Sequence, residues 1–90
     1  MTTVEKELTL KNKVGLHARP AALFVQTARK YKSKIQVIKK DRVADAKSIL
    51  SILSLGADYG DKIRIVCEGE DAEDALKELT ELVENKFGEE

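Results

Sequence analysis

The sequence has one cysteine, one proline, one histidine and no tryptophan among its 90 residues. The single Cys67 cannot form an internal disulfide, and no group of cysteines and histidines has the spacing of a metal site. Val66 and Glu68 flank Cys67 in a segment that resembles a strand, so we expect Cys67 to be a buried thiol of the core. The sequence therefore predicts neither a metal site nor a bound cofactor.

Neither sign of charge is in excess, because 16 basic residues balance 16 acidic ones. Proteins that bind nucleic acid usually carry a basic excess, and a small RNA-binding sheet displays aromatic side chains on its strands. The aromatic residues here all lie outside the predicted strands: Phe24, Tyr31, Tyr59 and Phe87. Direct binding to nucleic acid is therefore excluded.

The chain also lacks a long apolar run and a cleavable signal pattern. These absences predict a soluble, cytoplasmic protein that does not insert into a membrane. Glycine-rich nucleotide loops and HExxH patterns are missing too. Ninety residues suit one domain, over residues 1–90, with room for a core of two layers.

Four strands and three helices are predicted from the spacing of apolar residues. Alternation indicates strands at 4–10, 34–39, 42–45 and 62–68, with a turn at Lys40-Asp41 between the second and third because Asp tolerates turn conformations. Helical patterns cover about 19–29 and 47–55, and a longer third helix is expected to start at an Asp71 cap and stop at Gly88. This βαββαβα order predicts an α+β open-faced sandwich, an antiparallel sheet with helices on one face.

The segment from Gly15 to Pro20 holds the only histidine, His17. Gly15 permits an unusual turn and Pro20 suits the first turn of a helix, so His17 is expected where a turn becomes a helix. Unpaired N–H groups and the positive end of the helix dipole collect there and favour phosphate. A neutral imidazole is a good nucleophile, and the guanidinium of Arg19 suits phosphate oxygens. We therefore predict a histidine that accepts a phosphoryl group; the alternative is an ordinary surface histidine.

A second informative segment runs from Lys47 to Gly56. Ser48 is well placed as the N-cap of a short helix, and Gly56 as its end. The helix has more apolar residues than one buried face needs: Ile49, Leu50, Ile52, Leu53 and Leu55. Some of them should form an exposed patch on which a partner docks. The alternative is a short helix that is mostly buried.

Both segments resemble motifs of a known family. Gly-Leu-His-Ala-Arg-Pro-Ala at 15–21 is similar to the active-site motif of HPr, the histidine-containing phosphocarrier of the bacterial phosphoenolpyruvate-dependent sugar phosphotransferase system. Lys-Ser-Ile at 47–49, with Ser-Leu-Gly at 54–56, is similar to its regulatory serine segment. The resemblance covers nearly the whole chain. It implies strand order 1-4-2-3 with three helices on one side of the sheet.

The resemblance also implies a function. His17 would accept a phosphoryl group on Nδ1 from phosphorylated enzyme I and pass it to a sugar-specific IIA domain. Arg19 would lie beside it, and Ala18 with Arg19 would present backbone amides to the phosphate. Such a protein is a stoichiometric intermediate in phosphoryl transfer and not a turnover enzyme.

Ser48 matches the second phosphorylation position of the family. In some relatives a serine kinase that uses ATP, paired with a phosphorylase, modifies this serine, and the product binds a catabolite-control transcription factor. The alternative for Ser48 is a plain N-cap. The resemblance further assigns a docking surface for partners around the histidine, made of Ala22, Arg29, Ile49, Leu50 and Leu53.

Two related functions compete with the sugar phosphocarrier. Regulatory relatives of the catabolite-repression type act only through the serine and lack the histidine, so the presence of His17 argues against them. A nitrogen-regulating paralogue would use the same histidine chemistry with a different enzyme I and acceptor. The segment around Ser48 favours the sugar pathway.

Overall fold

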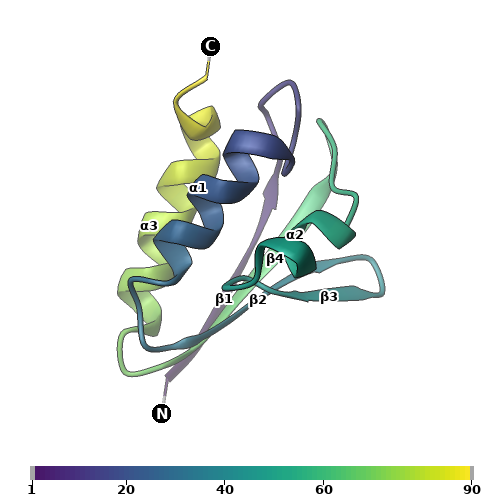
Figure 1. Cartoon of the computed structure of the whole chain (residues 1–90). Coiled ribbons are helices and arrows are strands. Elements are labelled where there is room, and N and C mark those ends of the chain that lie inside the picture. The colour runs from purple at the N-terminus through teal and green to yellow at the C-terminus, as the bar shows by residue number, and fades with distance from the viewer. Residues whose placement is uncertain (1, 90) are drawn as a thin grey trace.

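In the computed structural model, which describes residues 2–89, a four-stranded sheet is covered on one face by helices (Figure 1). The elements are β1 (Thr2–Thr9), α1 (Ala18–Ala28), β2 (Lys34–Lys39), β3 (Arg42–Asp45), α2 (Ile49–Ser54), β4 (Lys62–Gly69), α3 (Ala72–Glu84) and a short 3-10 turn, η1 (Lys86–Gly88). The strand order is β1-β4-β2-β3, and every neighbouring pair is antiparallel. The predicted α+β open-faced sandwich and the order 1-4-2-3 are therefore confirmed.

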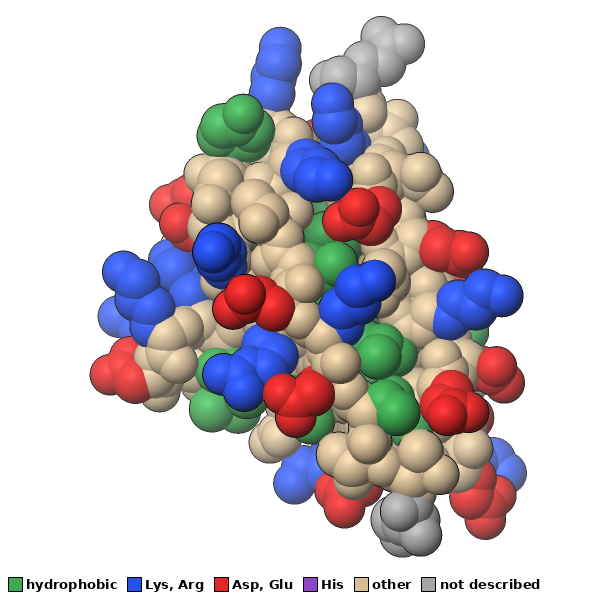
Figure 2. Space-filling model, turned by 180° about the vertical axis from the view of Figure 1, so that it is seen from behind, with side chains coloured by type: hydrophobic (Ala, Val, Ile, Leu, Met, Phe, Trp, Pro, Cys, Tyr) green, Lys and Arg blue, Asp and Glu red, His purple; other side chains and the backbone are tan. Residues whose placement is uncertain are grey.

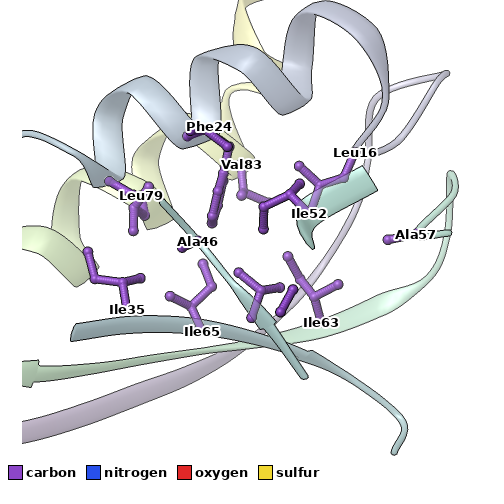
Figure 3. Packing of buried hydrophobic residues seen from close by; sticks show 14 of the residues in the cluster. Leu16, Phe24, Ile35, Ala46, Ile52, Ala57, Ile63, Ile65, Leu79 and Val83 are labelled. Atoms are coloured by element: carbon purple, nitrogen blue, oxygen red, sulfur yellow. The ribbon is translucent and has the colours of Figure 1, made fainter. Parts of the chain in front are cut away.

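The core lies between the sheet and the helices, as the alternation of apolar and polar residues along the strands predicted. Ile63, Ile65 and Cys67 of β4 all point to this side and are buried. Phe24 of α1 and Leu79 of α3 face Ile63 and Ile65 from the helical layer (Figure 3). Burying a side chain as large as Phe24 contributes about 1.5–3 kcal/mol, so these contacts hold the helices on the sheet.

The other face of the sheet is charged. Glu5 and Glu7 of β1 lie beside β4, and the Arg64 guanidinium pairs with the Glu5 carboxylate at 3.2 Å. Figure 2 shows this side of the molecule, with basic and acidic side chains intermingled and no histidine in view. The candidate site is therefore not on the open face of the sheet.

The expected capping role of Asp71 is wrong. Asp71 precedes α3, but its side chain makes no cap hydrogen bond, and its φ of −103° with ψ of 24° lies outside the extended region that capping uses. Its carboxylate instead accepts hydrogen bonds from the N–H groups of Lys32 (2.9 Å) and Ser33 (3.0 Å) and from the Ser33 hydroxyl (2.5 Å). Asp71 thus fastens the loop between α1 and β2 to the start of α3.

Asp71→Asn is expected to lower the free energy of unfolding at neutral pH but not in strong acid. The hydrogen bond from the Ser33 hydroxyl, followed by that from the Lys32 N–H, holds the pKa of the Asp71 carboxyl below its ordinary 3.8. A carboxyl whose pKa is lowered in the folded state stabilises the fold in full at pH values well above 3.8. This contribution is lost as the pH falls through the lowered pKa. Urea unfolding followed by circular dichroism across this pH range measures the difference.

Asp74→Asn is the matched control, because Asp74 is an exposed acid in the first turn of the same helix. It removes the same charge near the helix dipole without touching the loop. The free energy of unfolding at neutral pH should fall less for Asp74→Asn than for Asp71→Asn. Equal losses would show that the contacts of Asp71 with the loop add nothing to its interaction with the helix dipole.

Other details of the turns and element ends also differ from the prediction. The left-handed residue of the β2–β3 turn is Lys40 (φ 56°) and not Asp41, although the turn itself lies where predicted. Helix α3 ends at Glu84, before the expected stop at Gly88. The 3-10 turn that follows folds Phe87 back into the core, where it is buried.

Candidate functional site

His17 immediately precedes helix α1 and occupies its N-cap position, as predicted. Its backbone is extended, with φ of −128° and ψ of 166°. Within the described residues, the imidazole makes no capping hydrogen bond and the first turn of α1 holds no acid. The first hydrogen bond of the helix runs from the Ala21 N–H to the His17 carbonyl (3.3 Å). The N–H groups of Ala18 and Arg19 therefore lie at the positive end of the helix dipole, before the hydrogen-bonded turns.

The backbone before His17 is fixed by a second loop, which joins α2 to β4. The N–H of Leu16 donates to the Ala57 carbonyl at 2.9 Å, and the Leu16 side chain is fully buried in the core (Figure 3). Gly15 has φ of 68°, and a Cβ there would lie 2.5 Å from the Ala57 oxygen. The buried Asn12 amide donates to the Gly15 carbonyl at 2.8 Å. His17 is thus presented by a backbone that has little freedom to move.

The second loop places a carboxylate against the histidine ring. His17 Nε2 lies 2.7 Å from Asp58 Oδ1, and the two side chains are 36% and 71% exposed. A carboxylate can only accept hydrogen bonds, so Nε2 carries the hydrogen in this contact. In the neutral ring the lone pair is then on Nδ1.

Asp58 is the functional candidate that the sequence did not reveal. It stands 41 positions from His17, a separation that no helical or strand period brings together. It lies between the predicted helix end at Gly56 and the strand predicted at 62–68, in a connecting segment where aspartate is common for conformational reasons. The pairing of the two loops through Leu16 and Ala57 is what joins them, and that pairing is a property of the folded chain.

Asp58 is itself supported by a small polar cluster. Its N–H donates to Asp61 Oδ2 at 2.8 Å, and the Lys39 ammonium lies 3.0 Å from the same oxygen. Lys39 also donates to the Gly56 carbonyl at 2.7 Å. The hydrogen bond from Asp58, followed by that from Lys39, lowers the pKa of the Asp61 carboxyl. Asp61 therefore stays ionised and keeps the loop closed.

The structure gathers the predicted docking residues on helices α1 and α2, which pack against each other, and at Arg29, the residue that follows α1. Leu50 is 77% exposed, and Ile49 and Leu53 are each 37% exposed. Ala22 is half-buried on α1. The exposed Arg29 donates from Nε to the Lys47 carbonyl at 2.9 Å, which ties the end of α1 to the start of α2. The predicted exposed apolar patch is confirmed, since only part of α2 faces the core.

Ser48 is the N-cap of α2, as predicted. Its backbone is extended, and its Oγ accepts a hydrogen bond from the Ser51 N–H at 3.2 Å. The residue is half-buried, so part of it remains open to solvent. Gly56 follows the helix with φ of 60°, the left-handed conformation expected just after a helix end.

The described residues hold neither a metal site nor a reactive thiol. Within residues 2–89 no three His, Cys, Asp or Glu side chains group together in a way that could hold a metal ion. Burial raises the pKa of the Cys67 thiol to about 11, so Cys67 is an unreactive member of the core, as expected. None of the helices in this part of the chain has the length and apolarity needed to cross a membrane.

Comparison with known proteins shows the family to which the chain belongs. Residues 4–85 match the family model described as "PTS HPr component phosphorylation site". The chain belongs to the HPr family. It is 45% identical to the phosphocarrier protein HPr of Xylella fastidiosa strain Temecula1, over 96% of this chain and 97% of the relative. It is 40% identical to the HPr of Treponema pallidum, over 97% of this chain and 99% of the relative.

Solved HPr structures share the fold. The crystal structure of HPr-C-His from Thermoanaerobacter tengcongensis has a TM-score of 0.95 and 53% identity, covering 97% of this chain and 98% of its own. An HPr-like protein, Crh of Halalkalibacterium halodurans, is 41% identical over 92% of this chain and 99% of that protein. By family, the chain is a phosphocarrier protein and not a turnover enzyme.

Proposed function

We propose that this HPr-family protein carries a phosphoryl group on Nδ1 of His17, taken from phosphorylated enzyme I and passed to sugar-specific IIA domains. The observation that supports it most is the position of His17. The ring is partly exposed, precedes a helix with no acid in its first turn, and turns Nε2 toward a carboxylate. Nδ1 is then the ring nitrogen left to attack phosphorus.

In the proposed step, the lone pair of Nδ1 attacks the phosphorus atom. The Nδ1–P bond forms as the bond from phosphorus to the donor breaks, and the electron pair of the broken bond stays with the donor. The N–H groups of Ala18 and Arg19 and the Arg19 guanidinium bind the phosphoryl oxygens, because helix starts and guanidinium groups favour phosphate. Transfer to a IIA domain reverses these events with a new acceptor.

The partners dock on the surface made of Ala22, Arg29, Ile49, Leu50 and Leu53. An apolar centre with basic side chains beside it suits short-lived encounters with acidic proteins. Because enzyme I and the IIA domains take turns at the same histidine, one surface serves both. Neither partner needs to enter a deep pocket, since the His17 ring already reaches solvent.

Incubation with radiolabelled phosphoenolpyruvate and a catalytic amount of enzyme I tests the phosphocarrier function. The label should reach about one phosphoryl group per chain. It should be lost in acid, because phosphohistidine is acid-labile and phosphoserine is not. Addition of a sugar-specific IIA domain should remove it. Absence of label with the sugar-pathway enzyme I, but labelling by a nitrogen-pathway enzyme I, would move the protein to the nitrogen branch.

We further propose that Ser48 is phosphorylated by a serine kinase that uses ATP, in carbon catabolite control through a transcription factor. Its half-buried hydroxyl caps α2, next to the exposed Ile49 of the docking surface. A phosphate there would carry nearly two negative charges at a helix start, which tolerates them. The same charges would repel acidic partners and slow the transfer to His17.

Ser48→Asp is expected to slow phosphorylation of His17 by enzyme I while leaving the stability unchanged. Aspartate caps helices as well as serine does, so the capping contact with Ser51 is retained. Ser48→Ala is the control: it should lower the free energy of unfolding by about 1 kcal/mol and leave the transfer rate near that of wild type. The initial rate of labelling and urea unfolding measure the two effects. Equal transfer rates for Ser48→Asp and wild type would contradict the regulatory role.

A further inference from the structure

We propose that Asp58 is a positioning residue for phosphoryl transfer, holding the His17 ring with hydrogen on Nε2 so that Nδ1 is the acceptor. This inference rests on the proposed function of His17. It adds a residue from outside the His17 segment, contributed by the loop between α2 and β4. Figure 1 shows this loop and the start of α1 side by side at one end of the sheet.

The geometry allows one arrangement of the ring hydrogen. His17 Nε2 and Asp58 Oδ1 are 2.7 Å apart, a hydrogen-bond distance, and the ionised carboxylate has no hydrogen to give. The neutral ring therefore has its hydrogen on Nε2 and its lone pair on Nδ1. The same contact fixes the rotation of the ring about its Cβ–Cγ bond, which keeps Nδ1 from exchanging places with Nε2.

Asp58 can do this because its own backbone is fixed on two sides. Its N–H is held by Asp61, which pairs with Lys39 of β2. On its other side, the Asp58 carbonyl accepts a hydrogen bond from the Asp61 N–H at 3.0 Å, and the Ala57 carbonyl that precedes Asp58 accepts one from the Leu16 N–H at 2.9 Å. The distance between His17 and Asp58 is thus set by two loops that are fastened to each other and to the sheet.

The carboxylate also acts after the phosphoryl group arrives. When Nδ1 forms its bond to phosphorus and Nε2 keeps its hydrogen, the ring becomes a positively charged phosphoimidazolium. Asp58 compensates that charge and retains the hydrogen on Nε2. A ring that keeps this hydrogen departs from phosphorus as a neutral imidazole, so onward transfer needs no separate protonation. Because Asp58 is 71% exposed, water screens part of this effect.

The experiment compares wild type with Asp58→Ala and Asp58→Asn by two independent readouts. Nitrogen-proton correlation spectra of the unphosphorylated protein at alkaline pH, where imidazole rings are neutral, report which ring nitrogen carries hydrogen. The rate of labelling by enzyme I reports transfer. Glu73→Ala is the matched control, since it removes one exposed acid at the start of α3, at the far end of the molecule from the start of α1 (Figure 1).

Wild type and Glu73→Ala should show hydrogen on Nε2 alone. Asp58→Ala should show a mixture of both ring forms and slower labelling, by about tenfold, which is the lower end of the effect of removing a partner that orients a histidine. Asp58→Asn retains an acceptor oxygen without the charge. It should therefore retain the Nε2–H form, and its labelling rate should fall less than that of Asp58→Ala. A mixture in wild type, or unchanged spectra and rates in Asp58→Ala, would overturn the proposal. If no protein is labelled, the carrier function fails, while the spectra still decide whether Asp58 sets the ring form.

Discussion

Substitution of His17 by alanine is expected to reduce labelling from phosphoenolpyruvate and enzyme I to background, with the fold unchanged. His17 is the only histidine in the chain, and Cys67, the other nucleophile of comparable strength, is buried with a raised pKa. The imidazole makes no cap hydrogen bond to α1, and its contact with Asp58 is largely exposed to solvent, so its removal should change the free energy of unfolding by no more than about 1 kcal/mol. Acid-labile label and urea unfolding, measured on the same preparation, separate the two effects.

His17→Gln is the companion variant, because glutamine retains a polar side chain that can donate to Asp58 but has no nucleophilic nitrogen. Both variants should lack acid-labile label. Acid-labile label retained by either one would show that another residue accepts the phosphoryl group. If both variants have normal stability and take up no label, the imidazole ring of His17 is the phosphoryl acceptor.

The strands and helices could be predicted because their signals are local. Ile63, Ile65 and Cys67 alternate with polar residues, and this pattern alone fixes which side of β4 faces the core. The ends of α2 could be predicted because serine favours the N-cap position and glycine favours the left-handed conformation after a helix, as Ser48 and Gly56 show. The strand order came from the family resemblance and not from periodicity, since a period of two tells the face of a strand but not its neighbours.

What the sequence did not reveal is the set of contacts between loops. The carboxylates of Asp58 and Asp71 both sit in segments where aspartate is expected for turn or cap reasons, yet each binds a partner far along the chain. Phe87 likewise returns to the core through a left-handed turn after α3 had ended. Such contacts depend on where the layers bring the loops, so they follow from the packed fold and have no local pattern.

Gly15→Ala is expected to lower the free energy of unfolding by about 3 kcal/mol. The left-handed conformation of Gly15, with φ of 68°, costs an L-residue about 1–2 kcal/mol. The new Cβ would also lie 2.5 Å from the Ala57 oxygen and 2.7 Å from the Asp58 Cα, a clash with backbone that flexible side chains cannot relieve. Overpacking of this kind adds about 1–3 kcal/mol, and the total loss is a large fraction of the about 5–15 kcal/mol by which a domain is stable.

Gly56→Ala separates the two contributions, because Gly56 has a similar φ of 60° but, apart from Gly56 and its two chain neighbours, no atom of residues 2–89 lies within 4 Å of the place where a Cβ would stand. It should lose only the conformational part, about 1–2 kcal/mol, measured by urea unfolding under the same conditions. Equal losses for the two variants would mean that the approach of the loops at Gly15 is not tight. If Gly15→Ala folds by moving the loops apart, the His17 ring also loses Asp58, and phosphoryl transfer should fall together with the Nε2–H form. The same close approach of two loops would then account for both the stability of this end of the molecule and the orientation of its histidine.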